Sequence, residues 1–225
     1  MDEIKTLVDK IRQEAEREDF PVDLPIYQGA GKIPTQPILY AGNLDSNICF
    51  FGRDLGKDEV AQGQPLIGSA GKMLRKGFYQ GVYHQQPSSP EDLQSICDRA
   101  ILTNTVPYKP PGNKAYTIKV KERFRPFIAQ LLAIYWGGNQ IVTLGTEAFK
   151  WFAPYGPKEK LEEFWQRGDR YEAQLPITLE AVDFQGTKHQ RQVSLLPLPH
   201  PSPLNKRYYA KFPQMLQQRI NKFEF

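Results

Sequence analysis

The stretch that decides the fold is ICFFGRDLGKDEVAQGQPLIGSAGKML, residues 48–74. It opens with a short apolar run that ends at Gly52, continues through a glycine-rich loop, and enters a helical pattern at Ser69. An apolar run of this length bounded by glycine is typical of a buried strand. A strand that leads through a loop into a helix is typical of parallel α/β proteins. We therefore expect a strand over 48–52 and a helix that begins at Ser69.

Three further apolar runs resemble the first: AILTNTV at 100–106, QIVTLG at 140–145 and VSLLPLP at 193–199. Helical patterns that begin near Thr117 and Thr146 separate them, and a last helix is expected over 207–223. Strands separated by helices pair in parallel. The sequence thus predicts a three-layer α/β/α sandwich with a central, mainly parallel four-stranded sheet. We expect residues 170–184 to add an antiparallel excursion and residues 27–43 to form a loop.

Length and composition favour a single domain over residues 1–225. The 225 residues are 40% hydrophobic and 12% aromatic, which suffices for one substantial core. Residues 1–19 have the periodicity of an amphipathic surface helix. The charged start lacks the apolar segment of a signal peptide, and no apolar run approaches the length of a membrane span. We expect a soluble, cytoplasmic protein that does not enter membranes.

Charge and cysteine content restrict the partners and cofactors. The net charge is +4, but residues 188–225 hold seven lysines and arginines against one acid. Such an asymmetry indicates a surface that faces a polyanion, and an ordinary solvated helix face would explain it equally well. The two cysteines, Cys49 and Cys97, form no C-x-x-C pair, so their spacing predicts neither a zinc site nor a disulfide framework. No histidine spacing indicates a metal site either.

Polar residues follow each of the four predicted strands. They are Arg53 and Asp54, then Asn104, then Thr146 and Glu147, and finally His200. The carboxyl ends of parallel strands lie at one edge of a sheet, where α/β proteins bind ligands. Taken singly, each residue is more often a turn former or a hydrogen-bonded structural group. Their coincidence on one rim instead favours a pocket where a carboxylate, an amide and an imidazole converge.

The loop after the first strand suits a ligand with a phosphate or a nucleobase carbonyl. Its glycines allow close approach of the backbone, and the helix that follows presents N–H groups to an anion. Its spacing matches neither G-x-G-x-x-G nor the P-loop pattern, so it does not predict a nucleotide cofactor.

Three motifs in this order resemble the uracil-DNA glycosylase superfamily, and they span about residues 48–220. GRDLGKDEVAQGQPLIGSAGKML resembles the first motif and glycine-rich loop of the iron–sulfur, family 4-like branch. LTNTVPYKPPGNKAYT resembles that branch's strand ending in asparagine, followed by PPGN. LPHPSPLN is similar to the second catalytic motif of the branch without a cluster. The conjunction is far more specific than any one motif.

The resemblance implies roles for the residues on the rim. Asp54 would orient the attacking water and stabilise positive charge on the deoxyribose, and His200 would donate to uracil O2 as negative charge grows there. Asn104 would accept from uracil N3–H and donate to O4, which excludes cytosine. Gly52, Arg53 and Leu66 would complete the base-binding site.

The resemblance also implies DNA contacts in the last motif. The enzyme must flip a nucleotide out of the duplex. Leu204 would fill the vacated stack, and Ser202 would hold a flanking phosphate. Lys206 and Arg207 would face the phosphates that follow.

The chain departs from the family pattern at several positions. The iron–sulfur branch uses four cysteines, and two of those places hold Tyr108 and Phe124, so we expect no cluster and loops closed by aromatic packing. Leu55 replaces a proline, and Leu66 replaces the aromatic residue that stacks on uracil. Gly56 stands where one branch has a bulky residue that excludes the thymine methyl.

These features favour a monofunctional, monomeric glycosylase that hydrolyses the N-glycosidic bond of uracil in DNA without metal or cofactor and leaves an abasic site. Three alternatives stay open. Leu66 and Gly56 allow a glycosylase for another deaminated or damaged base. Leu55 and Leu66 allow a DNA-binding relative with little catalysis. An α/β hydrolase unrelated to nucleic acid has the weakest support.

Overall fold

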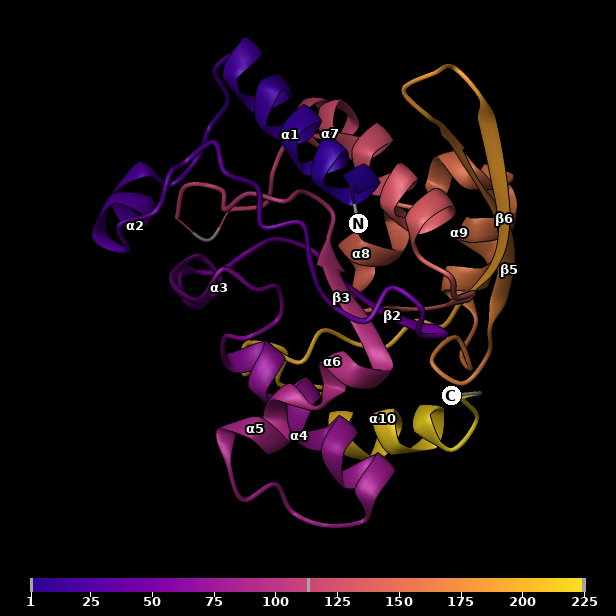
Figure 1. Ribbon diagram of the computed structural model, residues 1–225. Helices are drawn as coiled ribbons and strands as arrows, with labels where there is room; N and C mark the ends of the chain where they lie inside the picture. Colours follow the sequence, from indigo (N-terminus) through magenta and orange to yellow (C-terminus); the bar gives the residue numbers. More distant parts are fainter. Residues whose placement is uncertain (1, 113, 224–225) are drawn as a thin grey trace.

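The computed structural model describes residues 2–112 and 114–223, and its centre is a six-stranded sheet with the order β1-β3-β2-β4-β6-β5 (Figure 1). The strands are β1 Tyr40–Gly42, β2 Ile48–Gly52, β3 Ala100–Asn104, β4 Gln140–Thr143, β5 Leu175–Val182 and β6 Lys188–Leu195. β2 pairs in parallel with β3 and β4, and β4 pairs in parallel with β6. The edge strands β1 and β5 pair antiparallel. The mainly parallel sheet is confirmed, with six strands in place of four.

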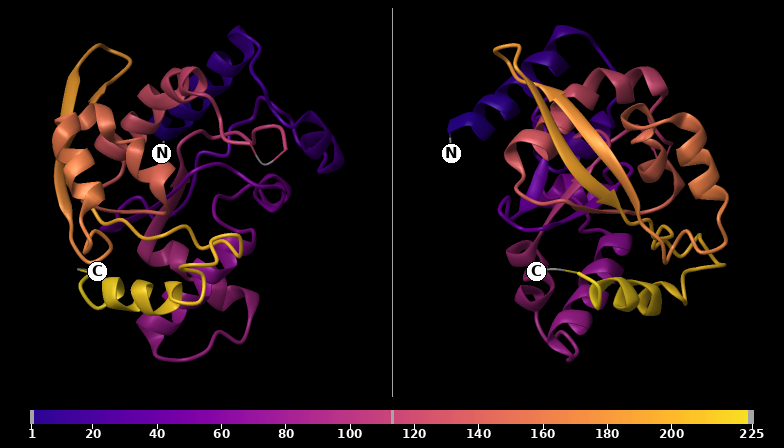
Figure 2. Two further views of the ribbon diagram at one scale, coloured as in Figure 1. Left: turned by 180° about the vertical axis from the view of Figure 1, so that it is seen from behind. Right: turned by 90° about the vertical axis from the view of Figure 1, so that its right-hand side faces the viewer.

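Both additional strands lie at the edges of the sheet. β1 falls within the expected loop over 27–43, and it has only three residues, too few to show a periodic pattern. β5 forms with β6 the long twisted hairpin of Figure 2, which confirms the antiparallel excursion. β6 ends at Leu195, not at residue 199. Beyond it, the N–H groups of Leu196 and Leu198 donate to the carbonyls of Ile141 and Thr143, so the chain stays beside β4.

Helices cover both faces of the sheet, as Figure 1 shows, and give the expected three layers. One face packs against α1 Asp2–Arg17, α7 Ile118–Gln130, α8 Thr146–Lys150 and α9 Lys158–Gln166; the other packs against α4 Ser69–Tyr83, α6 Ile96–Arg99 and α10 Phe212–Ile220. Successive residues of β2 alternate between the two layers. Cys49 and Phe51 belong to the first core, and Ile48 and Phe50 to the second. Every residue of β2 is buried, as a central parallel strand requires.

The remaining helices are short. They are α2 Leu24–Gly29, α3 Lys57–Gln62, α5 Pro90–Gln94, the π-helix η1 Leu131–Tyr135 and the 3₁₀-helix η2 Ala153–Tyr155. Several predicted boundaries were close. α4 begins at Ser69 and α8 begins at Thr146, as expected, and a glycine occupies the capping position before each of them. The last helix begins at Phe212 instead of residue 207, because turns occupy the preceding residues. No helix among the described residues is long and apolar enough to cross a membrane.

Glycines bring α4 and α10 together on the second face. A Cβ atom at Gly77 would lie 2.9 Å from Leu216 Cδ2, and one at Gly81 would lie 2.6 Å from Ile220 Cδ1. Two larger side chains on α4 would therefore push α10 outward. This close packing fixes α10, the helix that follows the His200 segment.

Three aromatic rings close the loops at the first face. Tyr108 and Phe124 are fully buried with ring centroids 5.2 Å apart, and Phe20 lies 5.1 Å from the first and 5.0 Å from the second. Edge and tilted contacts at this spacing are favourable for aromatic rings. The Tyr108 hydroxyl donates to the Thr35 carbonyl over 2.9 Å, which satisfies its polar end. Packing therefore joins the segment after α1 to the β3–α7 loop and to α7.

We predict that Phe124→Ala lowers the free energy of unfolding by about 3–5 kcal/mol, because it removes a buried ring and leaves a cavity. Chemical denaturation monitored by circular dichroism measures the change. The matched control is Phe184→Ala, at an exposed phenylalanine in the β5–β6 turn, with an expected change below about 1 kcal/mol. Equal losses in the two variants would contradict the role of the aromatic cluster.

Candidate active site

The structure brings the polar residues that follow β2, β3, β4 and β6 to one rim of the sheet. The strand order β3-β2-β4-β6 places Asn104 beside the Gly52–Asp54 turn, and Gly145 beside the segment that leads to His200. The Thr105 N–H donates to the carbonyls of Gly52 and Arg53 over 3.1 Å each, so the ends of β2 and β3 stay joined beyond the ladder. The predicted rim is therefore present, with a carboxylate, an amide and an imidazole along it.

Gly52, Asn104 and Leu66 meet at the centre of this rim. Gly52 and Asn104 are direct partners in the parallel register. A Cβ atom at Gly52 would lie 2.6 Å from Asn104 Nδ2 and 3.0 Å from Leu66 Cδ2, so any larger residue would displace both. Asn104 is 1% exposed, and its Oδ1 has no hydrogen-bond partner among the described residues. A buried amide oxygen without a partner indicates a place where a ligand group donates.

Asp54 is a buried carboxylate with nearby positive charge. Its side chain is 5% exposed, and Arg53 Nε lies 2.6 Å from Oδ2 without the direction of a hydrogen bond. Neither carboxylate oxygen has a hydrogen-bond partner within residues 2–112 and 114–223. Burial raises the pKa of Asp54, while the charges of Arg53 and Lys121 oppose that rise. The group is thus poised to bind a donor or to face a cationic centre.

His200 lies at the exposed end of the rim, against Gly145. Gly145 has a φ of +91°, and a Cβ atom there would be 3.0 Å from His200 Cβ, so glycine permits the approach. The Gly145 N–H donates to the Leu198 carbonyl over 2.8 Å and holds the two segments together. Desolvation of the ring by the neighbouring segments lowers the pKa of His200, and the charge of Arg53 lowers it further. The imidazole is accordingly neutral near pH 7.

The segment after His200 folds back on itself and exposes Leu204. The His200 carbonyl accepts from the Ser202 N–H over 2.9 Å and from Asn205 Nδ2 over 3.1 Å. The Ser202 hydroxyl accepts from the Leu204 N–H over 3.3 Å. These bonds stiffen a turn whose apolar tip, Leu204, is 92% exposed. Lys206 and Arg207 follow on the surface.

Two departures from the family pattern have packing explanations. Leu55 is 3% exposed and packs with Tyr27, Ile38 and Val60, so it belongs to a small core rather than to the rim. Gly56 is the capping residue of α3, and a Cβ atom there would lie 2.5 Å from a carboxylate oxygen of Glu59. A bulky residue at position 56 is therefore incompatible with this loop.

Sequence reasoning missed two groups close to Asp54. Tyr116 is 4% exposed, and its hydroxyl has no partner among the described residues. Burial is the main cause that raises the pKa of Tyr116, and nearby ionisable groups, including Asp54, raise it further. Lys121 Nζ lies 2.7 Å from Glu147 Oε2, and its charge also reaches Asp54. Tyr116 follows the PPGN motif, whose Asn113 lies outside the described residues. The sequence indicated Glu147 only as a polar residue at the end of a strand. No sequence spacing connects Tyr116 or Lys121 to Asp54.

The residues present do not fit an iron–sulfur cluster. The 225-residue sequence has two thiols: Cys49 is buried inside β2, and Cys97 is on α6 across the sheet. Four thiolates are the usual ligand set for such a cluster. The two relevant positions, Tyr108 and Phe124, are buried in the aromatic cluster described above. The described part of the chain also contains no group of three or more His, Cys, Asp or Glu side chains that could hold a metal ion.

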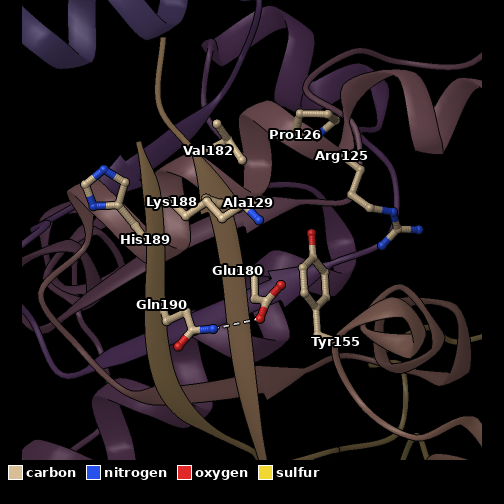
Figure 3. Close-up of a pocket in the computed structure, with 10 residues that line it drawn as sticks. Arg125, Pro126, Ala129, Tyr155, Glu180, Val182, Lys188, His189 and Gln190 are labelled. Atoms are coloured by element: carbon tan, nitrogen blue, oxygen red, sulfur yellow. Dashed lines mark hydrogen bonds between the residues drawn. The ribbon is translucent and has the colours of Figure 1, made fainter. Parts of the chain in front are cut away.

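A separate cavity of about 360 Å³ lies beside the β5–β6 hairpin, away from the rim (Figure 3). Arg125 and Tyr155 face Glu180 and Gln190 across it. Gln190 donates to Glu180 over 2.8 Å, whereas Arg125 Nε is buried without a hydrogen-bond partner among the described residues. The rim is the better candidate for chemistry, because it brings together a buried carboxylate and a buried amide at the carboxyl ends of parallel strands.

We predict that Arg53→Gln raises the pKa of His200 toward its ordinary value and raises the pKa of Asp54 further. A positive charge disfavours a protonated imidazole and favours an ionised carboxylate, so its removal moves both groups upward. NMR titration of the imidazole and carboxyl resonances measures both shifts. Lys57→Gln, at an exposed lysine of α3, is the control and leaves them in place. An unchanged His200 titration in Arg53→Gln would contradict the electrostatic coupling.

Comparison with known proteins agrees with this geometry. The sequence profile of the Uracil DNA glycosylase superfamily matches residues 39–224, which include the whole rim. The chain is 29% identical over 118 residues to a type-4 uracil-DNA glycosylase of Thermotoga maritima, covering 52% of this chain and 55% of that protein. It is 32% identical over 118 residues to a type-4 uracil-DNA glycosylase of Archaeoglobus fulgidus, covering 51% of each. The matched segment thus spans about half the length of these relatives. With most of its residues inside the family profile, the chain belongs to the uracil-DNA glycosylase superfamily.

Proposed function

We propose that this protein is a monomeric, monofunctional uracil-DNA glycosylase, with residues 1–225 as one glycosylase-like domain. It would hydrolyse the N-glycosidic bond of uracil in DNA and leave an abasic site, without metal or cofactor. The observation that supports this most is that the buried Asp54 carboxylate and the unpartnered amide oxygen of Asn104 lie on one rim, which ends at His200.

Asn104 is the group that would read the base. Uracil offers a donor at N3 and an acceptor at O4, which match the Oδ1 and Nδ2 atoms of one amide. The unpartnered Oδ1 then gains the N3–H of the base. Cytosine has the opposite pattern at these two positions, so it would leave the buried amide unsatisfied.

Asp54 and His200 would act at the two ends of the bond that breaks. The Asp54 carboxylate would orient a water molecule and stabilise the positive charge that develops on the sugar. Its nearness to Arg53 and Lys121 favours the ionised form that this role needs. A neutral His200 would donate a hydrogen bond to O2 as the base departs, consistent with its lowered pKa.

The exposed turn after His200 would engage the duplex. A target base inside a duplex must leave the stack before it can enter a buried site. Leu204 is an almost fully exposed apolar side chain on a turn braced by hydrogen bonds, as a wedge requires. Ser202, Lys206 and Arg207 would contact phosphates beside it.

A glycosylase for another base is the second candidate, and the base pocket supplies a specific reason. The side chain beside Asn104 is the aliphatic Leu66. Stacking on an aromatic ring contributes about 1–3 kcal/mol per base in nucleic-acid binding. A pocket without that ring on this side would depend less on a flat pyrimidine.

The deciding experiment measures release of free bases by the purified protein from oligonucleotides with uracil, hypoxanthine or xanthine. We expect uracil release, with Asp54→Asn lowering the single-turnover rate at least about 10²–10³-fold while DNA affinity stays within a few-fold. Asp58→Asn, a neighbouring carboxyl-to-amide change, serves as the control. Release of hypoxanthine or xanthine alone would favour the second candidate. Absence of release of every tested base by the folded protein, with uracil presented in single-stranded, U:A and U:G substrates, would refute both.

We predict that Leu204→Ala reduces kcat/KM on duplex U:A substrates by at least about tenfold and changes activity on single-stranded uracil by less than about threefold, because only the duplex requires the stack to be filled. Parallel kinetics on the two substrates measure the difference. Leu24→Ala, at another exposed leucine, is the matched control. Equal losses on both substrates would contradict the wedge role.

A further inference from the structure

The carboxylate of Glu59 ties together both ends of the loop between β2 and α4. Glu59 is 8% exposed, and its Oε2 accepts from the Gly56 N–H over 2.9 Å. Its Oε1 accepts from the N–H groups of Ile67 and Gly68 over 3.0 Å and 2.8 Å. No lysine or arginine of the described residues forms an ion pair with it within 4 Å. One buried carboxylate thus receives three backbone N–H groups from two distant points of the loop.

Between these points lies the one residue of the loop, other than glycine, with a left-handed backbone. Leu66 has a φ of +52°, which L-residues with a branched side chain adopt rarely and at a cost. Such a conformation persists where neighbouring groups enforce it. The Ile67 N–H bond to Glu59 begins at the very next residue, so the carboxylate holds the chain directly after the strained position.

Arg75 of α4 holds the same residue from the other side. It is 2% exposed, and its Nε donates to the Leu66 carbonyl over 2.8 Å, while Nη2 lies 3.4 Å from the Pro65 carbonyl. A Cβ atom at Gly71 would lie 2.0 Å from the Leu66 oxygen, so this carbonyl occupies space that only glycine leaves open. Leu66 is therefore clamped at its carbonyl and at the peptide that follows it.

The clamp determines where the Leu66 side chain lies. Its Cδ2 and Asn104 Nδ2 both border the space above the Cα atom of Gly52. With a relaxed backbone, Leu66 would point elsewhere and leave that side of Asn104 open. The strained conformation therefore places an aliphatic side chain beside the ligand-binding face of Asn104.

We propose that Glu59 and Arg75 are positioning residues that act through Leu66, and that Leu66, held in this way, is a specificity-determining wall of the base pocket. The inference rests on the proposed function, because it assigns the pocket to a base. Glu59 touches none of the reacting atoms and works by fixing the backbone on both sides of Leu66. Leu66 contributes to binding of the base and not to the bond that breaks.

The test is a double-mutant cycle of Glu59→Gln and Leu66→Ala, with Asp58→Asn as the matched carboxyl-to-amide control on α3. In Glu59→Gln the side-chain NH₂ can no longer accept, so at least one of the three bonds is lost. We expect each single variant to raise KM for uracil-containing DNA about tenfold with kcat within about threefold, which is the pattern of lost binding. The double variant should match Leu66→Ala alone, because the two residues act as one unit.

Multiplicative effects in the double variant would overturn the proposal, since Glu59 would then act by another route, such as the Asp54 turn. An unchanged KM in Glu59→Gln would overturn it as well. If Glu59→Gln does not fold, Arg75→Lys replaces it in the same cycle, because lysine keeps the charge but loses the guanidinium fork.

A readout without activity separates this inference from the proposed function. NMR resonances of the Leu66 methyl groups and of the Asn104 side-chain amide should shift in Glu59→Gln and stay in place in Asp58→Asn. Wild-type protein that releases no base would refute the proposed function alone. Unshifted Leu66 and Asn104 resonances in a folded Glu59→Gln variant would refute the clamp, whatever the activity.

Discussion

The site depends on the parallel register of β2 with its two neighbours. This register sets Gly52 opposite Asn104 and ends β2, β3 and β4 at a common edge. A shift of one residue would turn every side chain of β2 to the other face of the sheet. It would also replace Gly52 beside the amide by a residue with a side chain, for which the Asn104 and Leu66 contacts leave no room. The two buried cores hold the register, because alternate residues of β2 are buried in one core or the other.

The polar groups of the rim lower the stability of the folded protein. Asn104 Oδ1 is buried without a hydrogen-bond partner among the described residues, which costs about 1–3 kcal/mol, and the Asp54 carboxylate is buried with Arg53 as its ion-pair partner. Leu66 adds the cost of its left-handed backbone. A fold tolerates such costs where they prepare a site for a ligand, since the groups are already desolvated and aimed before it arrives. Packing of the two cores offsets them.

Loops that present the rim are held by side-chain packing and buried charge. The Phe20, Tyr108 and Phe124 rings join the segment after α1 to the β3–α7 loop and to α7. Nearby, Lys109 Nζ donates to Asp23 Oδ2 over 2.6 Å and to the Gly112 carbonyl over 2.7 Å. The β2–α4 loop uses the Glu59 carboxylate in a comparable way. In both loops a buried group gathers backbone segments that are distant in sequence.

The sequence by itself determined the layered architecture, the central strands and the residues at their ends, because period, length and turn residues are local properties of the chain. It also indicated Asp54, Asn104 and His200 through the order of their motifs. It could not reveal β1, which is too short to show a pattern, or the true start of α10, which turns delay. Only the tertiary structure decided that Leu66 takes a left-handed backbone beside Asn104, that Tyr116 and Lys121 lie near Asp54, and that Glu59 binds the loop from within. Those relations depend on contacts between residues far apart in sequence, and no local pattern encodes such contacts.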